Sequence, residues 1–186
     1  ADAYNNRGIA LVELGELDKA IASYKQAIQI RPDYAEAFYN LGNALQELGQ
    51  LNEAIQYYEK AIQIRPDSAE AYNNRGIVLV ELGKPNEAIK SYEKAIKIKK
   101  DYAEAYSNCG IALQELRKLS EATENFRKAI SIAPENEIFW DAFAHCLQAV
   151  RFTSCDESLV YDLLQILEQR TANPHRISRA LISALQ

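Results

Sequence analysis

The sequence predicts an all-α fold, a solenoid in which pairs of antiparallel helices stack on one another and a helical cap covers the C-terminal end. Aromatic, glycine and alanine residues return every 34 residues through the first 136 of the chain's 186 residues. Helix-capping residues, glycines and prolines also recur at fixed places. A repeat of this length is typical of helix pairs that bury their apolar faces only against neighbouring pairs. We therefore predict four repeats, 1–34, 35–68, 69–102 and 103–136, followed by a degenerate fifth repeat and cap over 137–186.

Five kinds of position recur in a fixed order within each interval. They are an aromatic residue, a glycine, an alanine, a second aromatic residue and a second alanine: Tyr4, Phe38, Tyr72 and Tyr106; Gly8, Gly42, Gly76 and Gly110; Ala20, Ala54, Ala88 and Ala122; Tyr24, Tyr58, Tyr92 and Phe126; Ala27, Ala61, Ala95 and Ala129. We interpret the glycine and the first alanine as small because two helix axes approach closely there. The second aromatic residue is expected to fill the space between neighbouring repeats.

The first helix of each repeat is predicted to begin at an aspartate and to end before a glycine. A glutamate follows Asp33, Asp67 and Asp101 three residues later, and this spacing suits the capping of a helix N-terminus. The first helices should end near Leu14, Leu48 and Leu82, where Gly15, Gly49 and Gly83 can adopt the left-handed conformation that closes a helix. The fourth repeat has Arg117 in place of that glycine, so its turn is expected to be strained or differently shaped.

The second helix of each repeat is predicted to begin at a polar capping residue and to end before a proline. The caps are Asp18, Asn52, Asn86 and Ser120, and the helices should run to about Ile30, Ile64, Ile98 and Ile132. Pro32, Pro66 and Pro134 then block continuation of the helix. Lys100 stands where the third repeat lacks this proline, which predicts a longer or frayed helix there.

This order of aromatic, glycine, tyrosine, alanine, aromatic, alanine and proline residues resembles the tetratricopeptide repeat over residues 1–136. The departures are Arg7, Arg75 and Cys109, where the family usually has leucine, and Lys100 in place of proline. The resemblance implies a right-handed superhelix whose first helices line a concave groove. It also implies a protein–protein interaction scaffold that binds an extended peptide or a partner segment in that groove.

The resemblance places one row of asparagines on the groove: Asn6, Asn40, Asn74 and Asn108. Because an amide carries both a donor and an acceptor, such a row can pair with a peptide's own N–H and C=O groups. The row is similar to the groove in the repeat region of O-linked N-acetylglucosamine transferase, although it is equally consistent with conventional surface residues of the family. Basic residues that clamp a C-terminal carboxylate elsewhere in the family are replaced by Asn5, Tyr39, Asn73 and Ser107. We therefore expect no such clamp, and the candidate peptide-binding set is completed by Asn5, Tyr39, Asn43 and Asn73.

Two acidic rows are expected to flank these amides: Asp2, Glu36, Glu70 and Glu104, and Glu13, Glu47, Glu81 and Glu115. They favour a neutral or basic peptide partner, or they serve only as helix-start residues and a solvated face. A further set of residues supplies apolar patches in the groove or packs between repeats: Ile9, Val12, Ile77, Val80 and Ile111, alternating with Asn43, Gln46 and Gln114. The residues themselves leave these alternatives open.

Composition and motifs exclude several other classes of function. The net charge of −5 and the absence of a basic cluster argue against nucleic acid. No apolar run approaches the roughly 18 residues of a membrane span. The three cysteines lack metal-binding spacing and are expected to be buried or idle thiols in a reducing, cytoplasmic compartment. His145 and His175 belong to no catalytic motif, so we expect no enzyme, no cofactor and no metal.

The last fifty residues are predicted to form helices near 136–149, 156–169 and 174–186 that cap the stack. Trp140, Ala144 and Leu147 fall where a fifth first helix would place its aromatic, small and apolar residues. The segment also resembles a connector that precedes transferase domains in bacterial multidomain proteins. The chain begins inside the repeat pattern and ends inside an apolar one, so we expect a fragment of a longer protein. The alternative function is therefore a structural module that self-associates or docks on a transferase domain of the same parent chain.

Overall fold

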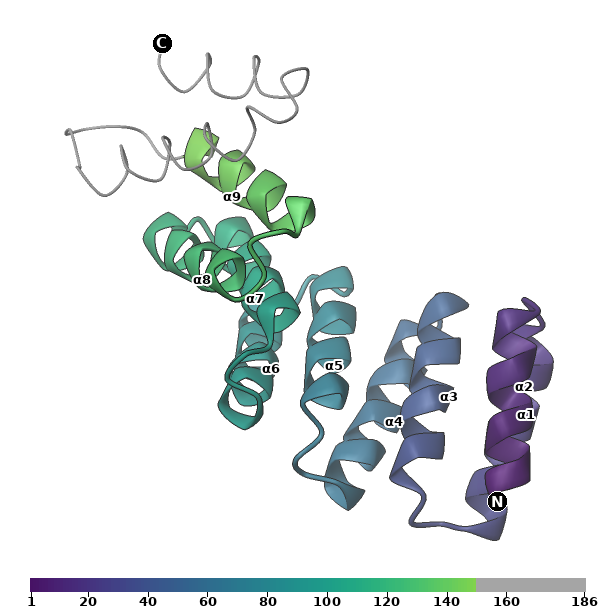
Figure 1. Ribbon diagram of the computed structural model, residues 1–186. Coiled ribbons are helices and arrows are strands. Elements are labelled where there is room, and N and C mark those ends of the chain that lie inside the picture. The colour runs from purple at the N-terminus through teal and green to yellow at the C-terminus, as the bar shows by residue number, and fades with distance from the viewer. Residues whose placement is uncertain (150–186) are drawn as a thin grey trace. The chain divides into compact units, whose positions relative to one another are not determined.

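A computed structural model describes residues 1–149, in which every regular element is an α-helix (Figure 1). The helices are α1 (Asp2–Glu13), α2 (Leu17–Ile30), α3 (Ala35–Glu47), α4 (Leu51–Ile64), α5 (Ala69–Glu81), α6 (Pro85–Ile98), α7 (Ala103–Glu115), α8 (Leu119–Ile132) and α9 (Glu137–Ala149). Consecutive helices pack as antiparallel pairs, which confirms the predicted all-α repeat solenoid. The chain divides into two units, Ala1–Asp101 and Tyr102 onward. The predicted helices 156–169 and 174–186, and the cap they would form, lie outside the described residues.

The first helices begin later than the sequence predicts. The residues that precede α3, α5 and α7 are Tyr34, Ser68 and Tyr102, and among these only Ser68 caps its helix, accepting a hydrogen bond from the Ala71 N–H at 3.3 Å. The prediction that aspartates cap the first helices was therefore wrong. Pro32 and Asp33 form a turn instead, which the Tyr34 N–H closes on the Arg31 carbonyl at 3.2 Å. The aspartate thus lies outside the helix it was expected to cap.

The second helices also begin without side-chain caps. The residues before α2, α4, α6 and α8 are Glu16, Gln50, Lys84 and Lys118, so the predicted caps Asp18, Asn52, Asn86 and Ser120 lie inside the first turn. The preceding glycine turn fixes this start, because the Glu16 N–H bonds back to the Leu11 carbonyl at 2.8 Å. All four predicted ends are confirmed. However, α6 is no longer than its counterparts despite Lys100, because Lys99 adopts an extended backbone there.

The turns between paired helices use the left-handed conformation in every repeat. Gly15, Gly49 and Gly83 have φ of 73°, 73° and 71°, which confirms the prediction for glycine. Arg117 takes the same conformation, with φ of 60°. A residue with a Cβ atom pays roughly 1 kcal/mol for this backbone. The fourth repeat therefore retains the turn geometry of the others at a conformational cost.

In the first unit, the second aromatic residue of each repeat packs on the glycine of its own repeat. A Cβ atom at Gly42 would lie 2.7 Å from Cε1 of the Tyr58 ring, and the same conflict arises between Gly8 and Tyr24 at 2.4 Å. The ring, rather than the helix backbone, is thus the nearest reason for the glycine. Tyr24 and Tyr58 also join one apolar cluster with Leu41, Leu45 and Val78, among others, which links the three repeats of this unit as expected.

The buried tyrosines predict a loss of stability at alkaline pH. Burial raises the pKa of Tyr24 to about 12 and raises that of Tyr58 further. The neutral phenol is therefore favoured by the folded state, so its contribution is complete below about pH 10 and is lost as pH rises through 12. We expect the denaturation midpoint to fall across this window. Tyrosinate absorbance should show buried tyrosines titrating after exposed ones, and Tyr24→Phe should weaken the pH dependence.

The second unit is held together by aromatic residues of α8 and α9. Phe126 and Phe143 are buried with ring centroids 6.4 Å apart, and the Trp140 indole Nε1–H donates to the Pro134 carbonyl at 2.8 Å. Trp140, Ala144 and Leu147 are buried in α9, and a degenerate fifth repeat stays a prediction. Cys109 and Cys146 are buried thiols that form no disulfide within the described residues, as predicted, whereas Cys155 lies outside them; burial raises the pKa of Cys146. No helix within residues 1–149 has the length and apolar character that crossing a bilayer requires.

Candidate functional site

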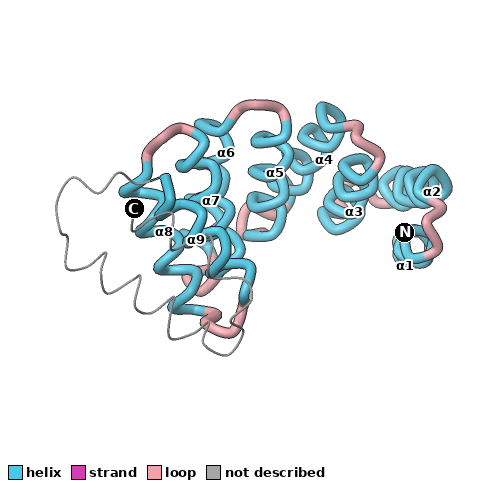
Figure 2. The backbone as a smooth tube through the Cα atoms, turned by 90° about the horizontal axis from the view of Figure 1, so that it is seen from above, coloured by secondary structure: helices cyan, strands magenta, loops and turns pink. Residues whose placement is uncertain are grey.

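The predicted peptide-binding residues of the first unit lie on α1, α3 and α5. These helices lie on one side of the unit, and α2, α4 and α6 lie on the other (Figure 2). We call the polar residues of this face the amide surface, which consists of Asn5, Asn6, Tyr39, Asn40, Asn43, Asn73 and Asn74. The surface is formed because a 34-residue period places equivalent residues of successive first helices next to one another.

Hydrogen bonds between side chains connect α1 to α3 across this surface. The Asn40 amide donates from Nδ2 to the Asn5 Oδ1 at 3.0 Å, and Asn5 Nδ2 donates to the Glu36 carboxylate at 3.1 Å. Asn5 is 0% exposed, so both of its polar atoms are satisfied inside the protein. Asn5 therefore holds Asn40 in place and does not face solvent.

The same connection is repeated between α3 and α5 with a different acceptor. Asn74 Nδ2 donates to the Tyr39 hydroxyl at 3.0 Å and to Asn43 Oδ1 at 3.1 Å. Asn74 lies 35 residues after its acceptor Tyr39, just as Asn40 lies 35 residues after its acceptor Asn5. The Tyr58 hydroxyl also lies 2.8 Å from Asn43 Oδ1. The buried Tyr58 hydroxyl of α4 thus donates a hydrogen bond to Asn43 of the amide surface and helps to hold it in place.

The members of the amide surface differ in what they can offer to a ligand. Asn6 is exposed and Asn73 is buried, and the latter donates to Asn74 Oδ1 at 3.2 Å. Asn40 is half-buried, and among described residues its Oδ1 accepts no hydrogen bond. Asn43 uses its Oδ1 internally, and its Nδ2 has no acceptor within residues 1–149. Asn108 lies half-buried on α7, in the second unit.

The flanking residues also divide between internal and external roles. Glu36 binds Asn5, and Glu81 accepts a hydrogen bond from Gln46 Nε2 at 3.1 Å. Val12 packs against the apolar cluster of the first unit, which favours the packing alternative for that residue. Ile9 is 38% exposed beside the amide surface, which favours the groove alternative. Thus the two alternatives apply to different members of the set.

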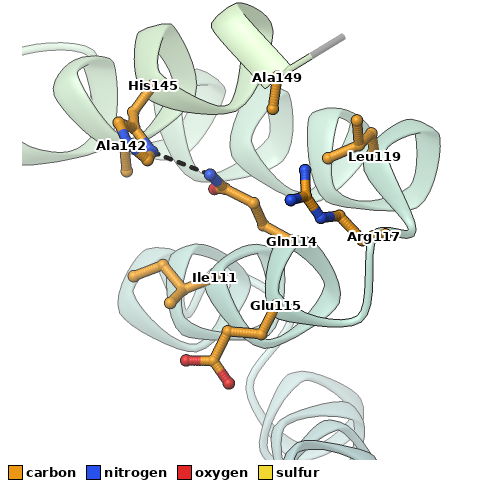
Figure 3. Close-up of a pocket in the computed structure, with 8 residues that line it drawn as sticks. All are labelled: Ile111, Gln114, Glu115, Arg117, Leu119, Ala142, His145 and Ala149. Atoms are coloured by element: carbon orange, nitrogen blue, oxygen red, sulfur yellow. Dashed lines mark hydrogen bonds between the residues drawn. The ribbon is translucent and has the colours of Figure 1, made fainter.

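The second unit contains a cleft that the sequence reasoning missed (Figure 3). It has a volume of about 630 Å³ and is lined by Ile111, Gln114, Glu115, Arg117, Leu119, Ala142, His145 and Ala149. Gln114 Nε2 lies 2.9 Å from His145 Nδ1 and forms a polar pair between α7 and α9. Ile111 is 41% exposed at this cleft. The replacement of a turn glycine by Arg117 was the only signal of it in the sequence.

No group of three or more His, Cys, Asp or Glu side chains within residues 1–149 is placed to hold a metal ion. The polar groups that converge in the two units are amides, carboxylates, a phenol, an imidazole and a guanidinium. Such groups make hydrogen bonds and ion pairs with a ligand.

The chain belongs to the tetratricopeptide repeat family. The family profile described as "Tetratricopeptide repeat" matches residues 33–101 and 67–135, and one described as "TPR repeat" matches residues 8–49. Neither match reaches residues 137–186, so the predicted resemblance to a transferase connector gains no support. Family membership and fold together define a protein-interaction module of the helical-repeat class.

Several solved structures have a similar fold. The crystal structure of MamA has 25% sequence identity and a TM-score of 0.77 over 89% of this chain and 95% of that one. YrrB, described as a TPR protein with an unusual peptide-binding site, has 22% identity and a TM-score of 0.75 over 98% and 91% of the two chains. The first TPR of Spaghetti (RPAP3), bound to the HSP90 peptide SRMEEVD, has 27% identity and a TM-score of 0.60 over 62% and 91%. No curated protein gives a significant match.

Proposed function

We propose that the chain is an interaction scaffold whose first unit binds an extended peptide or partner segment across the amide surface. The observation that carries this proposal is the set of hydrogen bonds that fixes Asn40 and Asn74 between successive first helices. An amide held in one orientation loses little conformational freedom when a ligand binds. The amide surface is thus preorganised for binding a peptide backbone.

The groups left over by the internal network complement a peptide backbone. Asn40 Oδ1 is available to accept from a peptide N–H, and Asn43 Nδ2 is available to donate to a peptide carbonyl. Asn6 offers a complete exposed amide. Contacts of this kind provide affinity for any extended segment, while Ile9 and the acidic side chains bias the choice toward neutral or basic segments with small apolar residues.

The comparisons support this proposal at the level of the class. The repeats of Spaghetti are bound to a peptide, and YrrB is described by its peptide-binding site. Asn73 and Asn5 have a supporting part in the proposal, because burial removes them from the ligand. Asn108 remains a predicted member, contributed by the second unit.

A double substitution of Asn40→Ala and Asn74→Ala tests the peptide site. The probe is the tightest binder selected from a random library of displayed dodecapeptides and then synthesised with capped ends. Loss of the Asn40 contact with the peptide, together with loss of the Asn74 bond that holds Asn43 in place, should weaken its binding roughly tenfold. Isothermal titration calorimetry measures the change. The control is Lys25→Ala with Gln26→Ala, two exposed residues of α2 on the opposite side of the unit.

A second variant separates binding from folding. Asn74 has internal partners, so its loss also perturbs the fold, whereas the Asn6 side chain makes no hydrogen bond within residues 1–149. Asn6→Ala should therefore weaken the probe about threefold with an unchanged melting temperature. The proposal fails if both amide variants bind the probe as tightly as the α2 control.

The second candidate function is a structural role in assembly. For both candidate functions we propose the same domain organisation, with four repeats over 1–136 and a cap over 137–186. Light scattering across a range of concentrations distinguishes them. Under the peptide-scaffold proposal the mass stays constant, whereas end-to-end association would make it rise with concentration.

A further inference from the structure

The turn between α7 and α8 uses an arginine where the other repeats use glycine. Arg117 has φ of 60°, close to the 71–73° of Gly15, Gly49 and Gly83. Glycine adopts this conformation without the steric cost that an arginine meets. Strained backbone of this kind clusters at binding and active sites.

The Arg117 guanidinium has no partner in the part of the chain that the structure describes. It makes no hydrogen bond or ion pair there. The neighbouring Lys118, by contrast, forms an ion pair in which its Nζ lies 3.7 Å from Oε1 of Glu121. Figure 3 shows the guanidinium directed toward the α9 side of the cleft, near Gln114 and Leu119. The Glu115 carboxylate points away from it. With respect to residues 1–149, Arg117 is therefore an available cation that lines the cleft.

The cleft around Arg117 combines one positive charge with apolar walls. The apolar walls are formed by Leu119, Ala142 and Ala149. A polar wall is formed by Gln114 and His145, whose Nε2 and Nδ1 atoms lie 2.9 Å apart. A single guanidinium matches one carboxylate through two parallel N–H···O bonds. A doubly charged phosphate is less well matched, because Arg117 is the single Lys or Arg among the described lining residues and the second charge would meet only the Glu115 carboxylate. As lined by the described residues, the cleft is open to solvent.

We propose that Arg117 binds the carboxylate of an internal glutamate or aspartate side chain of a partner segment, with an adjacent apolar residue packed on Leu119. This site is separate from the amide surface and does not depend on it. It assigns an acidic anchor to the partner of the second unit, and it explains why the fourth repeat keeps a strained arginine in a glycine turn.

The test uses the full chain and a capped pentapeptide, acetyl-Ala-Leu-Glu-Leu-Ala-amide, followed by chemical shifts of the ¹⁵N-labelled protein. Arg117→Gly should weaken binding about fivefold, the effect of removing one partly exposed ion pair. The same variant should raise the melting temperature by about 2–4 °C, because glycine relieves the strained turn. Loss of binding together with a gain in stability is a combination that a purely structural arginine does not give.

Matched controls isolate the charge and the position. Lys118→Ala removes the neighbouring cation, which does not line the cleft, and should leave binding unchanged. The peptide with glutamine in place of glutamate should bind about fivefold more weakly, as Arg117→Gly does. The proposal is overturned if the glutamate peptide shows no Arg117-dependent shifts or if the glutamine peptide binds equally well. It is also overturned if only acetyl-Ala-Leu with a free C-terminal carboxylate, or a phosphoserine peptide, depends on Arg117.

Discussion

Replacing Gly42 with valine is expected to lower the free energy of unfolding by about 3 kcal/mol. The new Cβ atom would lie 2.7 Å from Cε1 and 2.8 Å from Cδ1 of the Tyr58 ring, well inside contact distance. The ring has no free space to retreat into, because Tyr58 is fully buried and its hydroxyl is held near Asn43 and Gln46. Relief of the clash must separate α3 from α4.

Urea denaturation followed by circular dichroism measures this effect, with Ala22→Val as the matched control. Ala22 is exposed on α2, so the same side chain there should change stability by no more than about 0.5 kcal/mol. The displacement of Tyr58 should also disturb Asn43 and weaken the library-selected peptide. Equal stability of the Gly42→Val and Ala22→Val proteins would contradict the packing described for this unit.

Truncation of Phe126 to alanine is expected to destabilise the second unit by about 3–5 kcal/mol. Phe126 is completely buried, packs on Gly110 and lies 6.4 Å from the Phe143 ring. Its removal leaves a cavity between α7, α8 and α9 that the surrounding helices fill only in part. Trp140, the single tryptophan of the chain, is buried in α9 and reports on this unit by its fluorescence.

Phe126→Tyr provides the control for this truncation, because the other repeats carry tyrosine at the equivalent position. We expect it to change stability by no more than about 1 kcal/mol. The Trp140 fluorescence transition of Phe126→Ala should move to markedly lower urea concentration. If it coincides with that of the wild-type protein, Phe126 does not organise the second unit.

The sequence predicted the helices well because the repeated residues are the ones that set the packing. Glycines such as Gly49 require a positive φ, and large residues such as Tyr58 require a small partner, so both leave a pattern that sequence alone displays. The helix starts were less predictable. Asp33 and Asp18 are good caps by residue type, but the turn before each helix had already fixed where the helix begins.

The candidate site was predicted only in part, because its hydrogen bonds depend on the offset between neighbouring helices. The sequence places Asn40 and Asn74 in one row, but only the fold shows that each reaches a residue 35 positions earlier. It likewise gave no sign that Asn5 would be fully buried. The sequence shows Arg117 as a departure from glycine. The cleft that Arg117 lines could not be predicted without the position of His145 on α9.

The side-chain amide signals of asparagine in a ¹⁵N-labelled chain give the most direct test of the peptide-scaffold proposal. When the selected dodecapeptide is added, the Nδ2 signals of Asn6, Asn40 and Asn43 on α1 and α3 should shift together with the backbone signals of α5. Shifts confined to α2, α4 and α6, with these asparagine signals unmoved, would show that the partner binds the opposite side of the unit and would contradict the proposal.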